Sequence, residues 1–126
     1  MSVKFNVVER GKPGDNVTPK KFYASVVATD KINEREVAKQ AAAMSTVSTA
    51  DTLAAVENVL KIITSELARG NIVQLGEFGS FWLRVESDGS DTADQVSAGN
   101  ITNVLPRFTP GKEFQQALDA IKFEKA

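Results

Sequence analysis

The stretch that decides the fold runs from Val73 to Lys112. It reads, in order, VQLGEFGSFWLRV (73–85), ESDGSDTADQVSAGNITNVLP (86–106) and RFTPGK (107–112). Apolar and aromatic residues dominate the first part, as in a strand, and Pro110-Gly111 marks a turn into a following helix. The middle part has no basic residue and four acidic ones, Glu86, Asp88, Asp91 and Asp94. The stretch therefore predicts a strand over 78–85 and another over 101–108, joined by an acidic segment and followed by a helix, with a short strand over 72–75 before them.

Alternation along the strand over 78–85 predicts which side chains share a face. One face is expected to carry Phe78, Ser80, Trp82 and Arg84. The other is expected to carry Gly79, Phe81, Leu83 and Val85. Gly79 lies between two aromatic residues, which indicates a place where another backbone or ring packs closely. We interpret Trp82 as a packing residue of the sheet and not as a base-stacking one.

Two helices are expected before this stretch. The first covers about residues 34–44, with Val37, Ala41 and Met44 on its inner face. The second is capped by Ser48 and runs to about Arg69, where Gly70 ends it. Its apolar stripe consists of Leu53, Val56, Leu60, Ile63 and Leu67, and is widened by Val59 and Ile62. A helix that is apolar on more than one side needs cover on more than one side, from its own sheet and, as one alternative, from a second subunit.

Both ends of the chain add predicted elements. Val3, Phe5 and Val7 alternate with polar residues, and KKFYASVVAT (20–29) is rich in aromatic and β-branched residues. These two runs predict an antiparallel strand pair, and GKPGDN (11–16) predicts the loop that joins them. At the other end, a helix from about Lys112 to Ile121 is expected to turn three side chains inward, Phe114, Leu118 and Ile121.

The composition narrows the class of protein. A chain of 126 residues predicts a single domain, 1–126. No apolar run approaches the ~20 residues of a membrane span, so we expect a cytoplasmic protein with no membrane partner. The absence of Cys and His removes thiolate metal sites and the commonest general base. We expect no enzyme, no catalytic residue, no metal site and no cofactor; the spacing of Asp88, Asp91 and Asp94 fits no calcium-binding loop.

Charge is unevenly distributed along the chain. From Met1 to Lys31 there are six basic and three acidic residues, whereas from Glu86 to Pro106 there are four acidic residues and no basic one. Such asymmetry can mark a surface for a charged partner. The alternative interpretation is that exposed ends and loops carry charge for solubility.

Three segments resemble the bacterial histone-like HU/IHF family: SELARGNIVQL (65–75), IVQLGEFGSF (72–81) and RFTPGKEFQQAL (107–118). The resemblance covers roughly residues 32–122, the HU-like core. The extra N-terminal strands (1–31) and the closing IKFEK resemble a divergent HU-related branch of Bacteroides-type bacteria. The resemblance implies an α+β fold with two helices in the N-terminal half, an antiparallel β-sheet with a short or atypical arm, and a C-terminal helix. The N-terminal β-hairpin is an addition to it.

The resemblance also implies an intertwined homodimer, associated with the nucleoid, whose sheet saddle and paired arms bind DNA. In the family, basic residues hold phosphates and a proline at each arm tip wedges between base steps. By position, Lys112 matches the lysine of the family's PGK turn, Arg84 lies near the base of the arm, and Arg107 precedes the FxPGK motif. Nothing here matches the family's RNPxTG arm pattern; the nearest proline is Pro106.

Two functions stay open. The first is non-sequence-specific, architectural binding of duplex DNA as a homodimer, in which basic residues of the N-terminal strands lie beside the saddle and replace the arms: Arg10, Lys12, Lys20 and Lys21. The second is a protein–protein interaction module that keeps the HU scaffold and has lost DNA binding through its acidic arm. A basic protein would then be the partner of the arm, because an arm with four carboxylates repels a duplex.

Overall fold

Two compact units make up the chain in a computed structural model that describes residues 2–11, 13–14 and 16–126. Unit 1 contains Met1–Asn33 and Ala117–Ala126, and unit 2 contains Glu34–Gln116. Unit 2 is therefore one continuous segment, whereas unit 1 is built from both ends of the chain.

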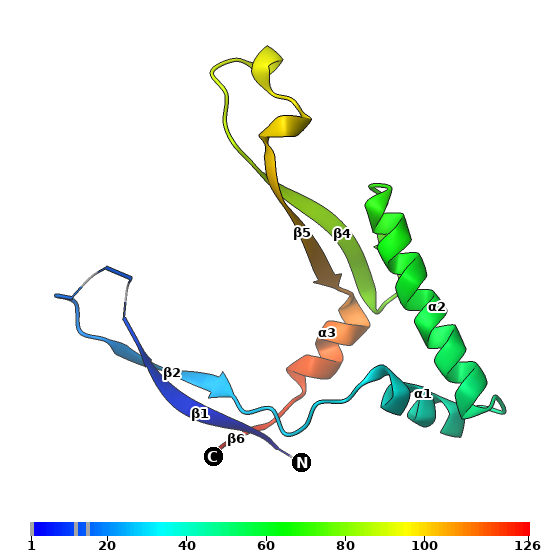
Figure 1. Ribbon diagram of the computed structural model, residues 1–126. Helices are drawn as coiled ribbons and strands as arrows, with labels where there is room; N and C mark the ends of the chain where they lie inside the picture. Colours follow the sequence, from blue (N-terminus) through cyan, green and yellow to red (C-terminus); the bar gives the residue numbers. More distant parts are fainter. Residues whose placement is uncertain (1, 12, 15) are drawn as a thin grey trace. The chain divides into compact units, whose positions relative to one another are not determined.

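The helical part of unit 2 consists of α1 (Glu34–Ala43) and α2 (Thr49–Ala68), and α1 lies beside the first half of α2 (Figure 1). The predicted ends of α2 are confirmed. The backbone N–H of Asp51 donates to Ser48 Oγ at 3.1 Å, which caps the first turn. After the last turn Gly70 adopts a φ of +82°, a left-handed conformation that glycine tolerates because it has no Cβ.

The inner face of α1 differs from the prediction. Ala38 is fully buried, whereas Val37 is 47% exposed and Met44 is 88% exposed. Met44 does not point inward because α1 ends at Ala43 and the chain turns there. In this turn the N–H of Met44 donates to the carbonyl of Ala41 at 3.1 Å.

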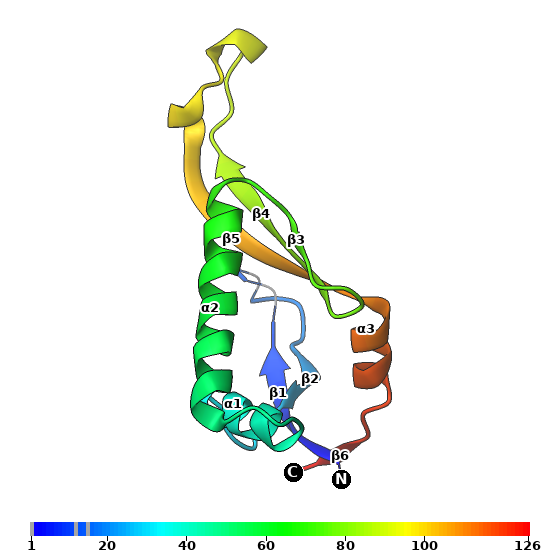
Figure 2. The ribbon, with the colours of Figure 1, turned by 90° about the vertical axis from the view of Figure 1, so that its right-hand side faces the viewer.

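Three antiparallel strands form the sheet of unit 2, in the order β3 (Val73–Gln74), β4 (Gly79–Ser87) and β5 (Ile101–Pro110) (Figure 2). The predicted strands are confirmed. β4 and β5 form a long hairpin that we call the arm. The next element, α3 (Lys112–Asp119), begins at the predicted residue but ends before Ile121, and Leu118 is 44% exposed instead of inward.

Phenyl rings hold α3 against one face of the arm. The ring of Phe114 lies 4.8 Å from that of Phe78 and 5.6 Å from that of Phe108, centroid to centroid. Phe108 also contacts Phe81, its partner across the strands, at 4.9 Å. The prediction that Phe78 shares a face with Trp82 is wrong. Gly79 adopts a φ of +149°, which no regular strand residue has, so the alternation does not extend back to Phe78.

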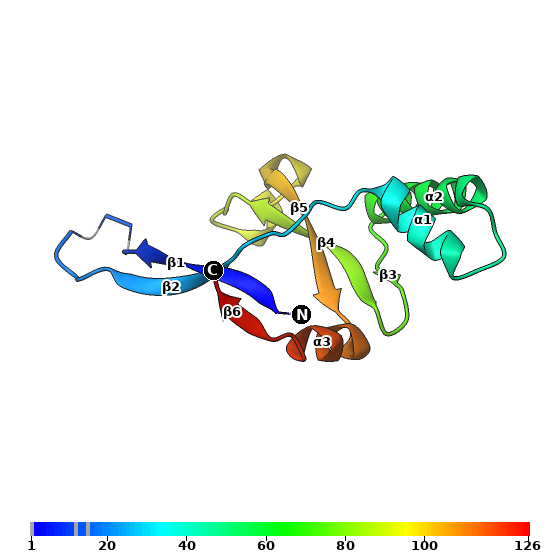
Figure 3. The same ribbon diagram turned by 90° about the horizontal axis from the view of Figure 1, so that it is seen from below.

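The sheet of unit 1 has three strands, with β1 (Val3–Arg10) between β2 (Lys21–Val26) and β6 (Phe123–Lys125) (Figure 3). The antiparallel pair of β1 and β2 was predicted and is confirmed. β6 was not predicted; it runs parallel to β1, and Val3 lies opposite Phe123. Lys4 Nζ lies 2.9 Å from Glu124 Oε2, so an ion pair also joins these two strands.

Very few side chains are buried. Among the described residues only Ala38, Leu67 and the backbone of Gly79 are buried. On α2, Val59, Leu60 and Ile62 are 47%, 52% and 58% exposed. The predicted widening of the apolar surface of α2 is therefore real, and neither its own sheet nor α1 covers this side of the helix.

Candidate nucleic-acid interface

One face of the arm brings together two of the predicted basic residues. Cross-strand partners point to the same side of an antiparallel pair, and this face alternates with the phenylalanine face. Arg107 lies opposite Trp82, and Arg84 lies two pairs further out, opposite Leu105 and on the same face. Both arginines are exposed. The arrangement offers two guanidinium groups, on neighbouring strands, to the same ligand.

Trp82 is anchored within this face. Its indole Nε1 donates to Thr109 Oγ1 at 2.7 Å, and the side chain is only partly exposed. The interpretation of Trp82 as a packing residue agrees with this bond, because a bonded indole holds its ring in one position. Thr109 was missed by sequence reasoning. Thr109 lies opposite Ser80, two pairs from the Trp82–Arg107 pair and on the same face, so only the strand register of the folded protein brings it close to the indole.

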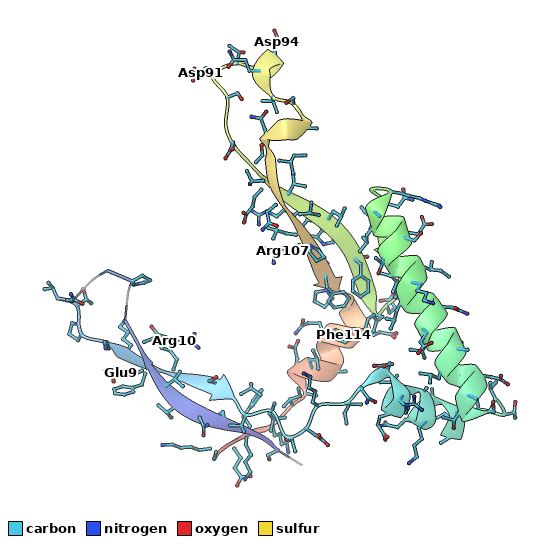
Figure 4. All side chains as sticks on the ribbon, viewed as in Figure 1. Glu9, Arg10, Asp91, Asp94, Arg107 and Phe114 are labelled. Atoms are coloured by element: carbon cyan, nitrogen blue, oxygen red, sulfur yellow. The ribbon has the colours of Figure 1, made fainter. Side chains whose placement is uncertain are left out.

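The charge of the arm changes along its length. Glu86 lies opposite Asn103 on the same face as the two arginines, and the loop beyond it carries three further carboxylates, Asp88, Asp91 and Asp94. Figure 4 shows Asp91 and Asp94 at the outer end of this loop and Arg107 nearer the helices of unit 2. The arm is therefore basic near its base and acidic at its tip.

Asn100 folds the loop at the tip. Its Nδ2 donates to the Asp88 carbonyl at 3.2 Å and to Ser90 Oγ at 3.0 Å, while its Oδ1 accepts from the N–H of Ser97 at 2.9 Å. Two short 3₁₀ turns, Ala93–Gln95 and Ala98–Asn100, complete the loop. The carboxylates thus lie on a folded loop at the end of the two strands.

The predicted basic residues of the N-terminal segment lie in unit 1. Arg10 and Lys21 are direct cross-strand partners. The aliphatic part of the Lys20 side chain lies beside Gly11: a Cβ added to Gly11 would be 3.1 Å from Lys20 Cγ. Glu9 leaves β1 on the side opposite to Arg10 (Figure 4). Lys12, the remaining residue of this group, lies outside the described residues.

Lys112 is the first residue of α3, in unit 2, and is exposed. The preceding residue, Gly111, lies so close to the Glu77 carbonyl group that a Cβ at this position would collide with it. Gly111 also donates its N–H to the Phe78 carbonyl at 2.8 Å. The turn into α3 is therefore packed directly on the loop between β3 and β4.

Two further classes of site are absent from the part of the chain that the structure describes. No helix there has the length and apolar character needed to cross a membrane. Nor do three His, Cys, Asp or Glu side chains gather within the described residues in a way that could hold a metal ion.

The family comparison covers nearly the whole chain. A family described as "HU domain fused to wHTH, Ig, or Glycine-rich motif" matches residues 1–125. A comparison with curated proteins finds no match.

Solved structures show the same fold. A Bacteroides vulgatus protein, assigned by inference as a bacterial DNA-binding protein, matches with a TM-score of 0.68 and 14% identity over 98% of this chain. The match spans only 47% of that protein, about half its length. A point mutant of HU from Thermotoga maritima matches with a TM-score of 0.52 and 24% identity, over 69% of this chain and 99% of that one. Anabaena HU, crystallised with DNA, matches with a TM-score of 0.57 and 22% identity, over 71% of this chain and 99% of that one.

Proposed function

Because the chain belongs to the family of HU domains fused to wHTH, Ig or glycine-rich motifs, we propose that it binds duplex DNA as a homodimer, without sequence specificity, in an architectural role. The observation that carries this proposal is the pair of exposed arginines, Arg84 and Arg107, on one face of the arm. We propose further that the two units act as a single HU-type domain in the cytoplasm, associated with the nucleoid, and that the protein is not an enzyme.

The chemistry of this face suits phosphate groups. Guanidinium groups hold phosphate oxygens in a bidentate manner, and neutralising phosphates supplies most of the affinity of non-specific binding. Phosphate contacts carry no sequence information, so such a face would accept any duplex. Lys112 of unit 2, and Arg10, Lys20, Lys21 and Lys12 of the N-terminal segment, are proposed as additional phosphate contacts.

The acidic tip limits how the arm can act. Its carboxylates repel phosphates, so the arm would approach a duplex with its basic part only. The tip also lacks a proline, since the nearest one, Pro106, lies within β5 and opposite Leu83. We therefore propose that this protein bends DNA less than a relative whose arm wedges a proline between base steps.

The homodimer is supported by the incomplete core of unit 2. An ordinary domain of this size buries most of its large apolar side chains. Unit 2 instead leaves Val59, Leu60 and Ile62 about half exposed on one helix. A shallow groove on α2, lined by Leu60, Lys61, Thr64, Ser65 and Ala68, lies on the same helix. A second copy that packs along α2 would cover these residues.

A second candidate function is favoured by the folded tip. Asn100 uses both its amide and its carbonyl group to hold Asp88, Ser90 and Ser97 in one arrangement. A loop that only adds solubility needs no such order. The alternative is therefore a protein–protein module whose arm tip presents carboxylates to a basic protein.

Salt titration of DNA affinity tests the first function. With a duplex of about 30 base pairs, we expect the logarithm of the association constant to fall linearly with the logarithm of the salt concentration. At low salt, Arg84→Glu and Arg107→Glu should each weaken binding about tenfold or more. Each variant should also reduce the salt slope by about 0.9 for every phosphate that it no longer neutralises. Fluorescence anisotropy with labelled duplex measures both quantities.

Lys39→Glu is the matched control, because it makes the same charge change on exposed α1. It should leave the affinity within about twofold if the arm face is the interface. Equal losses of DNA affinity in Arg84→Glu, Arg107→Glu and Lys39→Glu would mean that only the net charge of the protein determines binding. Absence of wild-type binding at low salt would reject DNA as the partner and leave the protein–protein module as the better explanation.

A further inference from the structure

The hairpin of β1 and β2 contains a cavity of about 590 Å³, and two of the cations proposed above as additional phosphate contacts, Arg10 and Lys21, line it. It lies within unit 1, between the end of β1, the start of β2 and the loop that joins them. Its described lining includes Arg10, Pro13, Pro19, Lys21 and Tyr23. Small-molecule sites in proteins typically measure about 300–1,000 Å³, so the cavity has the size of a ligand site.

Two cations meet at this cavity. Arg10 and Lys21 are direct partners across the strands, and like charges in that position destabilise a sheet. No described lining residue is acidic, and Glu9 leaves β1 on the other side (Figure 4). Lys20, whose stem runs beside Gly11 of the lining, adds a third cation nearby. An arrangement that costs stability, and in which none of the described lining residues is acidic, is suited to an anion that arrives as a ligand.

An aromatic ring lies next to the two cations. Tyr23 follows Lys21 by two residues on β2, so both side chains point to the same side of the sheet. Tyr23 is 49% exposed and lines the cavity together with Pro13 and Pro19. A flat, half-exposed aromatic face is the surface on which a nucleobase stacks.

We propose that this cavity binds a single nucleotide, with its phosphate between Arg10 and Lys21 and its base against Tyr23. Paired bases in a duplex are stacked on one another and do not offer a face to Tyr23. The ligand is therefore an unpaired nucleotide of a nucleic-acid strand or a free mononucleotide. The site lies within unit 1, contains neither Arg84 nor Arg107, and does not require duplex binding.

The test uses the full-length protein with two probes, a labelled oligonucleotide of about ten thymidines and free thymidine monophosphate. We expect Arg10→Glu and Lys21→Glu to weaken binding of the oligonucleotide about tenfold, and Tyr23→Ala to weaken it about fivefold or more. Tyr23→Phe should keep the affinity, because it keeps the ring. Fluorescence anisotropy measures the affinity for the oligonucleotide, and calorimetry measures the affinity for the monophosphate.

Phe22→Ala is the matched control. Phe22 precedes Tyr23 on the same strand, is 67% exposed and lies opposite Glu9, on the other side of the sheet. The inference predicts no loss in this variant. Binding of the monophosphate would identify a free nucleotide as the ligand, and binding of the oligonucleotide alone would identify a strand.

The inference is overturned if neither probe binds, or if Tyr23→Ala and Phe22→Ala behave alike. Duplex binding, measured in parallel with Arg84→Glu, separates this outcome from a failure of the proposed function. Loss of duplex binding in Arg84→Glu with unchanged oligonucleotide binding in Lys21→Glu would reject only the hairpin site. Oligonucleotide binding that depends on Lys21 and Tyr23, without any duplex binding, would support the hairpin site alone.

Discussion

Replacing Ile62 by Asp is expected to convert the proposed homodimer into a monomer with little residual cooperative unfolding. Ile62 is 58% exposed in the isolated chain and would be covered on both copies by the partner. A carboxylate in that position would enter an apolar contact twice per dimer. Desolvating a charge that has no partner costs several kcal/mol, so the loss should exceed a thousandfold in the dimerisation constant.

Sedimentation velocity over a range of protein concentrations measures this loss, and Ile62→Leu is the control that keeps the apolar area. The wild type and Ile62→Leu should sediment as dimers at concentrations where Ile62→Asp is a monomer. A wild-type protein that stays monomeric at high micromolar concentration would contradict the dimer, as would an Ile62→Asp variant that still dimerises.

Gly79→Ala is expected to lower the free energy of unfolding by about 3 kcal/mol or more, through backbone strain and overpacking together. Gly79 adopts a φ of +149°, a conformation that residues with a Cβ rarely take. An added Cβ would also lie 2.5 Å from the Thr109 carbonyl oxygen and 2.6 Å from the ring of Phe108. The strand could not keep its pairing with β5 and the phenylalanine packing at the same time.

Gly89→Ala is the matched control for this prediction. Gly89 has no left-handed φ, and its added Cβ would meet nothing within 4 Å. Urea unfolding at one fixed protein concentration should show a large fall in midpoint for Gly79→Ala and almost none for Gly89→Ala. Equal midpoints would mean that β4 can shift away from Phe108 without cost.

Features with a local physical cause could be predicted from the sequence. The ends of α2 follow from Ser48 and Gly70, each of which acts on the nearest turn of the helix. The exposed apolar side of α2 follows from the helical spacing of Val59 and Ile62. The strands on either side of the acidic segment follow from their apolar and aromatic content together with the turn at Pro110-Gly111.

Features that depend on distant parts of the chain could not be predicted. β6 has only three residues and pairs with β1, from the other end of the chain. The face of Phe78 depends on the φ of one residue, Gly79, which no periodicity rule includes. Because the register of β1 and β2 depends on the geometry of the loop between them, the sequence did not reveal that Arg10 lies opposite Lys21.

The residues of the candidate sites also differ in whether a local pattern marks them. Arg84, Arg107 and Lys112 were found by position in a recognisable pattern, whereas their arrangement on a face required the register of β4 and β5. Thr109 and Tyr23 were missed because a threonine or tyrosine in a strand is ordinary strand composition. Only a bond to Trp82 or a place beside two cations distinguishes them.

The parallel pairing of β1 with β6 has a consequence for biosynthesis. Residues emerge from the ribosome from the N-terminus onward, so β1 exists long before Phe123–Lys125 have been made. Until then one edge of β1 has no β6 partner, and such an unpaired edge can pair with other chains. Unit 2 is a continuous segment between the two halves of unit 1, so every residue it needs has been synthesised before the last strand. The sheet of unit 1 therefore cannot close before all residues of unit 2 have been synthesised.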